Sequence, residues 1–509
     1  MTMGKVYLLG AGPGDPELVT VRARRRLAEA DVVLYDALVH PDVLDHCRHD
    51  AERVFVGKRG GKPSERQDAI HARMLAAASA GKVVARLKGG DPFLFGRGSE
   101  EAEFLVDHGV PFEVVPGVPS PLAATAYAGV SLTHRDLASS VAYVTATENP
   151  EKDASSNDWS KLATATQTLV IFMGLRRLRS LMELLVEHGR SPETPVAVVQ
   201  WASMPEQRTV VGTVATIASV VEAAGIMMPA LTIVGEVVKL RDKLSWWDKR
   251  PLFGRRVVVT RAREQASGLA SLLRDAGAMP IELPTIRIVK APDPSALEAA
   301  VRSAAEHDAI AFTSSNAVDA FFESAERIGR DSRVVGSALV VALGQKTAES
   351  LHRFGIRPDL LPSLANAASA ADAIVARLPA GSKVLFPHSR IAREELPTRL
   401  RAAGIDVTEV VAYDTVAPTE GEASAIRHAF DQRIEAILFT SSSTVENLVA
   451  VLGPSAANAL SGVTLGSIGP TTSATIRRLR LSVDFESAQP KIEALVAALE
   501  DHVRTKEPG

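Results

Sequence analysis

Several things are scarce in this sequence of 509 residues, and each scarcity excludes a class of protein. Its single cysteine, Cys47, cannot form a disulfide within the chain, and no cysteine or histidine cluster has the spacing of a zinc site. No apolar run approaches the roughly 20 residues of a membrane span. The apolar run after Lys5 is too short for the core of a signal peptide, so we expect a cytoplasmic protein without a metal.

An excess of charge of one sign is also missing. The 57 Lys and Arg residues nearly balance the 60 Asp and Glu residues, so the net charge is −3 and the pI is about 6.5. Proteins that bind nucleic acid or anionic membranes usually carry a strongly basic face. We therefore expect neither partner. The length predicts several domains rather than one core.

Short β-branched runs alternate with Ala-, Leu- and Arg-rich stretches along most of the chain. This alternation predicts an α/β protein with mostly parallel sheets. The pattern breaks at residues 246–255, "WWDKRPLFGR", which we interpret as a linker between residues 1–245 and 256–502. We expect its two tryptophans to be packing anchors rather than a ligand platform.

The second half repeats itself. The segment "AIAFTSSNAVDAFF" (309–322) recurs as "AILFTSSSTVENLV" (436–449), and residues 340–351 recur in pattern at 465–476. A repeat of domain size predicts two similar α/β lobes. Lobe one would comprise about 256–287 plus 416–502, and lobe two about 288–415. Ligands of such lobes usually lie at the carboxyl ends of the strands.

The first half opens with a glycine-rich loop, "LLGAGPGDPEL" (8–18), directly after an apolar run. Its glycine spacing is G-x-G-x-G rather than the G-x-G-x-x-G of dinucleotide-binding loops. Pro13 removes a backbone donor, and Asp15 adds a negative charge. The loop therefore suits a neutral or cationic ligand better than a pyrophosphate.

Four more stretches of the first half carry turn residues after β-rich runs: "LYDALV" (34–39), "VGKRGGK" (56–62), "RLKGGDPFLFGRGSEE" (86–101) and "VVPGVPSPLAATAYAGVSLTHR" (114–135). With the opening loop, they resemble the tetrapyrrole methyltransferase superfamily, and most of all the uroporphyrinogen-III C-methyltransferases, over about residues 3–247. The resemblance implies two α/β subdomains, about 1–116 and 117–245, a homodimer formed through this half, and S-adenosylmethionine as cofactor. The sulfonium of that cofactor is cationic, in agreement with the loop chemistry.

The resemblance also implies the residues of the site. Asp36 and Lys58 take the acid–base positions, where a carboxylate stabilises charge on the substrate ring and a lysine returns a proton or binds a carboxylate. Turn and surface-charge roles remain the alternatives for these two residues, and a helix-capping role for Asp91. The family pattern places the cofactor at Pro13, Gly89, Gly90, Asp91, Leu94, Pro119, Ser120, Met173, Ala202 and Ala230. Arginines that would bind the carboxylates of the substrate are Arg22, Arg59, Arg97 and Arg135. The sequence departs from the family pattern at Thr145-Ala146-Thr147 and at Pro119. These departures bear on the details of the substrate more than on cofactor binding.

The second half resembles uroporphyrinogen-III synthase through "VVVTRA", "LPTIRI", "AFTSSNAV", "AYDTV", "LFTSSSTV" and "IGPTT", taken in order. This resemblance implies closure of hydroxymethylbilane with inversion of its last ring, without a cofactor. Tyr413 is the expected proton donor to the leaving hydroxyl, with a packed hinge tyrosine as the alternative. Hydroxyls and backbone N–H groups at helix starts bind carboxylates well. The expected substrate-binding residues are Arg261, Ser314, Ser315, Asn316, Arg390, Thr440, Ser441, Ser442 and Thr471.

The two resemblances together predict a bifunctional enzyme of tetrapyrrole biosynthesis. It would form uroporphyrinogen III and methylate it twice to precorrin-2, on the route to sirohaem or cobalamin. Two alternatives stay open. One is a methyltransferase for another substrate with an inactive synthase half, and the other is a tetrapyrrole-binding regulator without catalysis.

Overall fold

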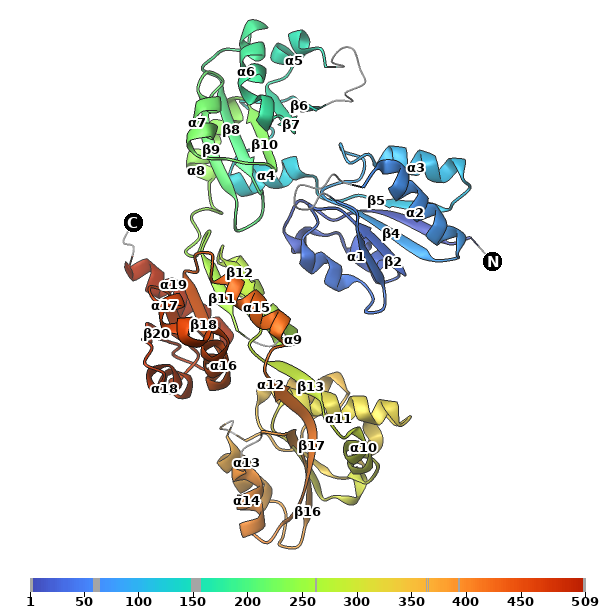
Figure 1. Ribbon diagram of the computed structural model, residues 1–509, viewed down its shortest axis with the longest axis vertical. Coiled ribbons are helices and arrows are strands. Elements are labelled where there is room, and N and C mark those ends of the chain that lie inside the picture. The colour runs from blue at the N-terminus through green and yellow to red at the C-terminus, as the bar shows by residue number, and fades with distance from the viewer. Residues whose placement is uncertain are drawn as a thin grey trace. The chain divides into compact units, whose positions relative to one another are not determined.

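The computed structural model describes residues 3–57, 65–147, 157–260, 263–362, 364, 366–391 and 394–506. The chain divides into two compact units, Met1–Arg255 with Leu273–Met279, and Arg256–Leu272 with Pro280–Gly509. Each unit is built around two five-stranded sheets with helices packed against them (Figure 1). The α/β class predicted from the alternating sequence pattern is confirmed.

The first sheet is entirely parallel, with the strand order β3-β2-β4-β1-β5. Its strands are β1 (Lys5–Gly10), β2 (Val32–Tyr35), β3 (Glu52–Phe55), β4 (Val83–Lys88) and β5 (Phe112–Val115). Apolar residues of α1 (Val21–Leu27) pack on one face, and those of α2 (Gln67–Ser79) and α3 (Gly98–Asp107) pack on the other. Because all five strands run in one direction, their carboxyl ends meet at a single edge.

The second sheet is mixed, with the order β6-β7-β10-β8-β9. Its strands are β6 (Val141–Thr145), β7 (Thr168–Phe172), β8 (Pro195–Gln200), β9 (Arg208–Thr213) and β10 (Ala230–Val234). β10 is antiparallel to both neighbours, so its first residue, Ala230, lies opposite Gln200, the last residue of β8. One face carries α4 (Ser120–Ala128), and the other carries α5 (Trp159–Ala165), α6 (Leu178–Glu187) and α7 (Ile217–Ala223).

The tryptophans of the predicted linker pack on this first unit. Trp247 is buried against the ring of Tyr127, with the ring centroids 4.8 Å apart. Trp246 donates its indole N–H to the carbonyl oxygen of Ala126, at 2.8 Å. Trp247 thus acts as the packing anchor that the sequence indicates, whereas Trp246 is 45% exposed.

The second unit contains two sheets, with the strand orders β12-β11-β18-β19-β20 and β13-β17-β16-β14-β15. The sheet of lobe one consists of β11 (Arg256–Val259), β12 (Met279–Glu282), β18 (Ala436–Phe439), β19 (Thr464–Ser467) and β20 (Phe485–Glu486). The other consists of β13 (Arg287–Lys290), β14 (Ala309–Phe312), β15 (Leu339–Ala342), β16 (Lys383–Ser389) and β17 (Asp406–Val416).

The sequence repeat becomes a structural repeat. β11, α9 (Arg263–Asp275) and β12 correspond to β16, α14 (Glu395–Ala402) and β17. β18 and α16 (Ser442–Leu452) correspond to β14 and α11 (Ser315–Arg327), and β19 and α18 (Pro470–Arg478) correspond to β15 and α12 (Gln345–Arg353). The four corresponding strands follow one another in the same order in the two sheets, and β20 and β13 add an edge strand at opposite ends. This arrangement confirms the predicted fold of two repeated α/β lobes.

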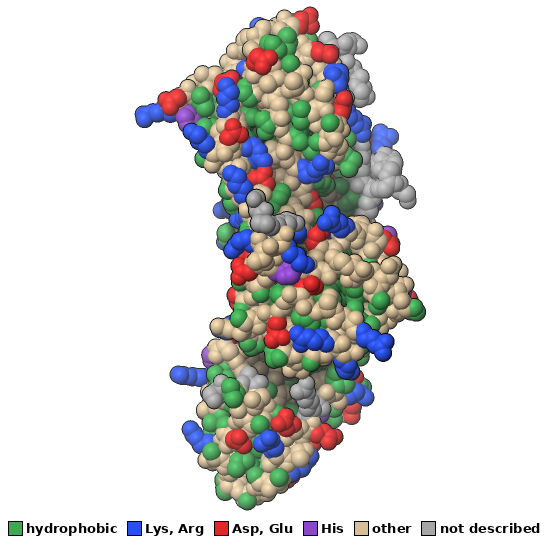
Figure 2. All heavy atoms as spheres, turned by 90° about the vertical axis from the view of Figure 1, so that its left-hand side faces the viewer, with side chains coloured by type: hydrophobic (Ala, Val, Ile, Leu, Met, Phe, Trp, Pro, Cys, Tyr) green, Lys and Arg blue, Asp and Glu red, His purple; other side chains and the backbone are tan. Residues whose placement is uncertain are grey.

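The surface shown in Figure 2 carries Lys and Arg side chains interspersed with Asp and Glu, and no broad area of one sign. Within the residues that the structure describes, no helix is both long and apolar enough to span a membrane.

A cluster of phenylalanines packs in the core against the sheet that contains β14. Phe312 on β14 is 1% exposed, and its ring centroid lies 5.4 Å from that of Phe321 on α11. We expect Phe312→Ala to lower the free energy of unfolding of the second unit by about 3–5 kcal/mol, because a large buried ring is lost and a cavity is left. Urea denaturation followed by circular dichroism measures this change.

Leu361→Ala in the same lobe is the control, since Leu361 is 46% exposed. We expect it to change stability by less than about 0.5 kcal/mol. Equal losses in the two variants would contradict the core position of Phe312.

Candidate active sites

The predicted motifs of the first half gather at the carboxyl edge of the first sheet. Gly10, the last residue of β1, lies opposite Lys88, the last residue of β4. Asp36 directly follows β2, which is the neighbour of β4 on its other side. The Gly89-Gly90-Asp91 turn follows β4, and Gly117 follows β5. Four segments that are distant in the sequence therefore meet at one place.

The opening loop uses its backbone donors within the protein. The N–H of Ala11 donates to the carbonyl oxygen of Lys88, and the N–H of Gly12 donates to that of Gly90. The N–H of Asp15 donates to Ser203 Oγ, at 3.1 Å. A phosphate-binding loop instead keeps such N–H groups free for the ligand. The structure thus agrees with the exclusion of a pyrophosphate drawn from Pro13 and the glycine spacing.

The sequence suggested that the charge of Asp15 faces the ligand, but in the structure its carboxylate binds groups of the protein. One carboxylate oxygen accepts the N–H of Glu17, and the other accepts the hydroxyl of Tyr127, at 3.1 Å. Burial and the neighbouring Asp15 raise the pKa of Tyr127. Asp15 therefore ties the loop to α4, and its charge is directed at Tyr127 rather than at a ligand.

Three loops approach so closely at this edge that no side chain fits between them. A Cβ on Gly10 would lie 2.4 Å from the N atom of Gly117, and a Cβ on Gly117 would lie 2.2 Å from the carbonyl oxygen of Gly90. Gly90 itself has a φ of +70°, and a Cβ there would meet only Pro119 and Ser120, at 3.9 Å. The open side of Gly90 therefore faces the turn formed by these two predicted cofactor residues.

Asp91 holds the turn together. Its Oδ2 accepts the N–H of Gly117, at 3.0 Å, and its Oδ1 accepts the N–H of Phe93, at 2.8 Å. Both oxygens thus bind backbone groups of the loops. This arrangement is closer to the capping alternative than to direct contact with a ribose or an amino group.

The remaining predicted cofactor residues lie along one edge of the second sheet. Met173 follows β7, Ala202 follows β8 by two residues, and Ala230 begins β10. The strand register brings Leu231 opposite Phe172 and Ala230 opposite Gln200, so these segments are adjacent. Met173 is 47% exposed and has a φ of +53°. Left-handed backbone at a non-glycine residue is unfavourable and often accompanies a functional site.

The two edges of the first unit are in direct contact. The ring centroids of Phe95, from the 86–101 motif, and Phe172, at the end of β7, are 4.7 Å apart. The Asp15–Ser203 and Asp15–Tyr127 hydrogen bonds join the same two subdomains. The structure therefore assembles most predicted cofactor residues, including Pro13 and Leu94 in the flanking loops, around one interface between the subdomains.

Asp36 is held by a buried ion network that the sequence interpretation missed. Arg86 Nη2 donates to Asp36 Oδ1, at 2.8 Å, and Arg86 Nε donates to Glu101 Oε1, at 3.0 Å. Lys88 Nζ also donates to Glu101 Oε1, at 2.9 Å. The sequence feature that could have predicted this network is the pair of charged residues at alternate positions of the otherwise apolar strand "VVARLK" (83–88).

The predicted substrate-binding arginines have different surroundings in the structure. Arg22 lies 3.7 Å from Glu113, and Arg97 forms an ion pair with Glu100, so each already has a carboxylate partner. Arg135 is exposed in the loop after α4. Lys58, Arg59 and Arg261 lie outside the described residues.

In lobe two, Tyr413 and Ser314 are brought together. The Tyr413 hydroxyl and Ser314 Oγ share a hydrogen bond of 3.1 Å. Ser314 follows β14, and its Oγ accepts the N–H of Ala317 at the start of α11, where Ser315 and Asn316 form the first turn. Arg390 follows β16 and pairs with Asp414, with Nε and Oδ2 2.8 Å apart.

Lobe one repeats this arrangement without a tyrosine. Thr440 follows β18, and the Oγ of Ser441 accepts the N–H of Thr444 at the start of α16. Ser442 Oγ donates to the carbonyl oxygen of Thr471, at 3.2 Å, which joins α16 to α18. The hydroxyl of Ser441 thus caps a helix, which was the alternative to substrate binding for this residue.

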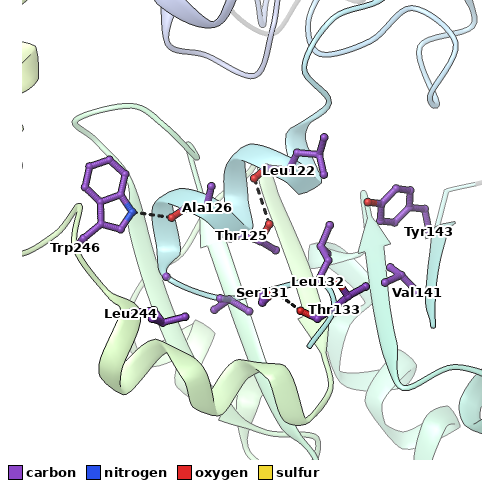
Figure 3. Close-up of a pocket in the computed structure, with 12 residues that line it drawn as sticks. Leu122, Thr125, Ala126, Ser131, Leu132, Thr133, Val141, Tyr143, Leu244 and Trp246 are labelled. Carbon is purple, nitrogen blue, oxygen red and sulfur yellow. Dashed lines mark hydrogen bonds between the residues drawn. The ribbon is translucent and has the colours of Figure 1, made fainter. Parts of the chain in front are cut away.

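A cavity of about 670 Å³ lies beside α4 in the second subdomain of the first unit. Figure 3 shows Trp246 and Leu244 at one end, Tyr143 and Val141 at the other, and Leu122 on α4. None of its 12 lining residues is ionisable at neutral pH. It therefore lacks the cations that a polycarboxylate substrate requires, and the edge near Asp36 is the better candidate site. The described part of the chain contains no group of three His, Cys, Asp or Glu residues suited to a metal ion.

Comparison with known proteins assigns the two halves to two families. Residues 5–218 match the model of the Tetrapyrrole (Corrin/Porphyrin) Methylases, and residues 267–497 match that of Uroporphyrinogen-III synthase HemD. The chain is 36% identical to the porphyrin biosynthesis protein HemD of Ruminiclostridium josui, over 92% of either chain. The chain therefore belongs to the fused family that joins a tetrapyrrole methylase to a uroporphyrinogen-III synthase.

Further similarities each cover about half of the chain. The chain is 51% identical to siroheme synthase of Azotobacter vinelandii, over 49% of this chain and 53% of that protein. The chain thus spans about half the length of the siroheme synthase that it matches. The uroporphyrin-III C-methyl transferase of Thermus thermophilus complexed with S-adenyl homocysteine is 44% identical, over 47% of this chain and all of that one, with a TM-score of 0.40. The predicted methyltransferase and synthase classes are confirmed by the family matches, and S-adenosylmethionine agrees with the methylase family.

The two hydrogen bonds of the Asp91 carboxylate generate a prediction. We expect Asp91→Ala to lower the local stability of the turn by about 1–3 kcal/mol, because the N–H groups of Phe93 and Gly117 lose their acceptors. Faster hydrogen exchange at these two amides, measured by NMR, reports the change. Asp293→Ala removes a similar acceptor from Ser295 in the second unit and leaves both amides unaffected. Unchanged exchange in Asp91→Ala would contradict this role.

Proposed function

We propose that the chain forms uroporphyrinogen III from hydroxymethylbilane in its second unit and methylates it twice in its first unit, giving precorrin-2. The observation that carries this proposal is the carboxyl edge of the first sheet. Asp36 shares this edge with a loop in which the N–H groups of Ala11, Gly12 and Asp15 are bonded within the protein and cannot serve a phosphate. The family matches of both halves support the same pair of activities.

The residues at this edge fit S-adenosylmethionine, which supplies an electrophilic methyl group when bound. Gly90 offers backbone without side-chain obstruction, because a Cβ there would meet only the backbone of Pro119 and Ser120, at 3.9 Å. Met173 offers an exposed apolar side chain. Ala202 and Ala230 are small residues at the facing edge of the second sheet. A ligand without phosphate requires few free backbone donors, which is what the opening loop provides.

Asp36 is proposed to act on the substrate ring. Its carboxylate is partly exposed while one oxygen is held by Arg86. In this position Asp36 stabilises the positive charge that develops on a pyrrole ring as the carbon–carbon bond forms, and it accepts the proton that the ring then loses. The nearby exposed apolar side chains of Leu38, Phe93 and Phe95 suit the faces of a macrocycle.

Tyr413 is proposed to act in ring closure. Its hydroxyl protonates the leaving hydroxyl of hydroxymethylbilane, so that water departs, and Ser314 orients the phenol through their shared hydrogen bond. The helix starts at Ser314 and Ser441 present hydroxyls and N–H groups that suit the carboxylates of the substrate. The protein then holds the reactive chain ends close together, which is the main catalytic requirement.

We expect that a single substitution can remove one of the two activities and leave the other intact. Asp36→Asn should slow methylation by about 10²-fold or more but leave formation of uroporphyrinogen III intact. Tyr413→Phe should slow ring closure by about 10²-fold and leave methylation of added uroporphyrinogen III intact. The assay supplies hydroxymethylbilane with and without S-adenosylmethionine and identifies products by mass and isomer.

Each variant is the control for the other, because both keep the full chain. Uroporphyrinogen I as the sole product of the wild-type chain would show an inactive synthase half. Binding of uroporphyrinogen without formation of any product would favour a regulator instead.

Ligand preference gives a further prediction. Calorimetry should detect binding of S-adenosylhomocysteine and none of ATP or NAD. Gly117→Ala should weaken that binding by about tenfold, equivalent to about 1.4 kcal/mol, because its Cβ would meet the Gly90 carbonyl oxygen at 2.2 Å. Gly421→Ala in the second unit, where nothing lies within 4 Å of the added Cβ and the backbone is not left-handed, is the matched control. Tight binding of ATP in place of S-adenosylhomocysteine would refute the assignment.

A further inference from the structure

A buried cluster of charges lies behind the Asp36 carboxylate. Arg86 and Lys88 are two residues apart on β4, so both side chains leave the same face of the sheet and reach Glu101 on α3. Arg86 is 2% exposed, Lys88 is 4% exposed and Glu101 is fully buried. With Asp36, the cluster contains two cations and two anions.

Arg86 is the connecting residue of this cluster. One guanidinium binds Glu101 Oε1 through Nε, at 3.0 Å, and Asp36 Oδ1 through Nη2, at 2.8 Å. Its Nη1 donates to the carbonyl oxygen of Leu87, at 3.3 Å. Because the guanidinium is planar and its donors point in fixed directions, these bonds together fix the orientation of the Asp36 carboxylate.

Glu101 and Lys88 in turn hold Arg86. Glu101 Oε1 accepts bonds from Arg86, from Lys88 and from Gln67 Nε2, the last at 3.0 Å. Lys88 Nζ lies 4.0 Å from Asp36 Oδ2. Burial lowers the pKa of Lys88. A buried ion cluster contributes little net stability, because desolvation of the charges offsets their attraction. Its placement directly behind Asp36 is better explained by positioning.

We propose that Arg86 is a positioning residue for Asp36, and that Glu101 and Lys88 hold Arg86 in place; this inference rests on the methyl transfer proposed above. The carboxylate of Asp36 is fixed on its inner side and left partly open on the other, where the substrate ring would lie. The network presents the carboxylate to the ring in one orientation.

The test is Arg86→Lys in the full chain. A lysine keeps the charge, but one compact ammonium cannot bridge the two carboxylates with the same geometry. We expect kcat for methylation to fall by about 10²-fold, since small displacements of a catalytic group have effects of that size. We expect KM for both substrates to stay within about twofold, because neither substrate contacts Arg86.

Arg26→Lys is the matched control. Arg26, on α1 of the same subdomain, also bridges two carboxylates, those of Glu29 and Glu113. We expect its kcat to be unchanged. An equal loss in Arg26→Lys, or a raised KM with unchanged kcat in Arg86→Lys, would overturn the positioning role.

Glu101→Gln keeps the shape of the side chain and removes its charge. It is the second variant and decides the question if Arg86→Lys does not fold. We expect a lower kcat at constant KM here as well, and an unchanged kcat would overturn the proposal.

Crystal structures of the wild-type chain and the variants provide a readout without activity. The Asp36 carboxylate should change orientation in Arg86→Lys, and an unchanged carboxylate would refute the proposal. Failure of the wild-type chain to methylate uroporphyrinogen III would count against the proposed function alone, and the position of Asp36 would still decide the role of Arg86.

Discussion

The first unit depends on the close approach of three loops at the carboxyl edge of its parallel sheet. Gly10 and Gly117 lie so close to each other and to the Gly90 carbonyl oxygen that neither tolerates a Cβ, and Asp91 fixes the same loops through two backbone N–H groups. The loops therefore satisfy one another with their own donors and acceptors. Because these backbone N–H groups are already hydrogen-bonded, the edge is unsuited to phosphate and suited to a ligand recognised by shape and by apolar contact.

Charge at this edge is balanced rather than accumulated. Arg86 and Lys88 face Asp36 and Glu101, so the interior of the subdomain carries paired ions close to the substrate side. Such pairing allows a carboxylate to stay in a largely apolar environment with a defined direction. In the second unit, hydroxyls at helix starts and the phenol of Tyr413 provide polarity, together with the ion pair of Arg390 and Asp414.

Much of the fold was predictable because it depends on local patterns. Alternating apolar runs and amphipathic stretches predict strands and helices from short-range sequence, and the repeated "FTSS" segments predict two equivalent lobes before any contact is known. The mixed second sheet was harder to predict. The direction of β10 depends on which neighbours it pairs with, and its sequence "ALTIV" is compatible with either direction.

The sequence by itself determined the chemical character of the candidate sites: a glycine- and proline-rich loop with few free donors, Asp36 at the end of a strand, and Tyr413 in the segment "VVAYDTV". Only the tertiary structure decided which side chains these residues meet. Arg86 and Glu101 are 15 residues apart and meet because α3 packs on the face of the sheet that contains β4. Ser314 and Tyr413 are 99 residues apart and meet because β14 and β17 lie in one sheet with only β16 between them. Asp15 shows the same limit, since its charge is visible in the sequence, whereas its partner, Tyr127, comes from a helix 112 residues away. Side-chain pairing depends on strand order and helix packing, and these are set by contacts distant in the sequence.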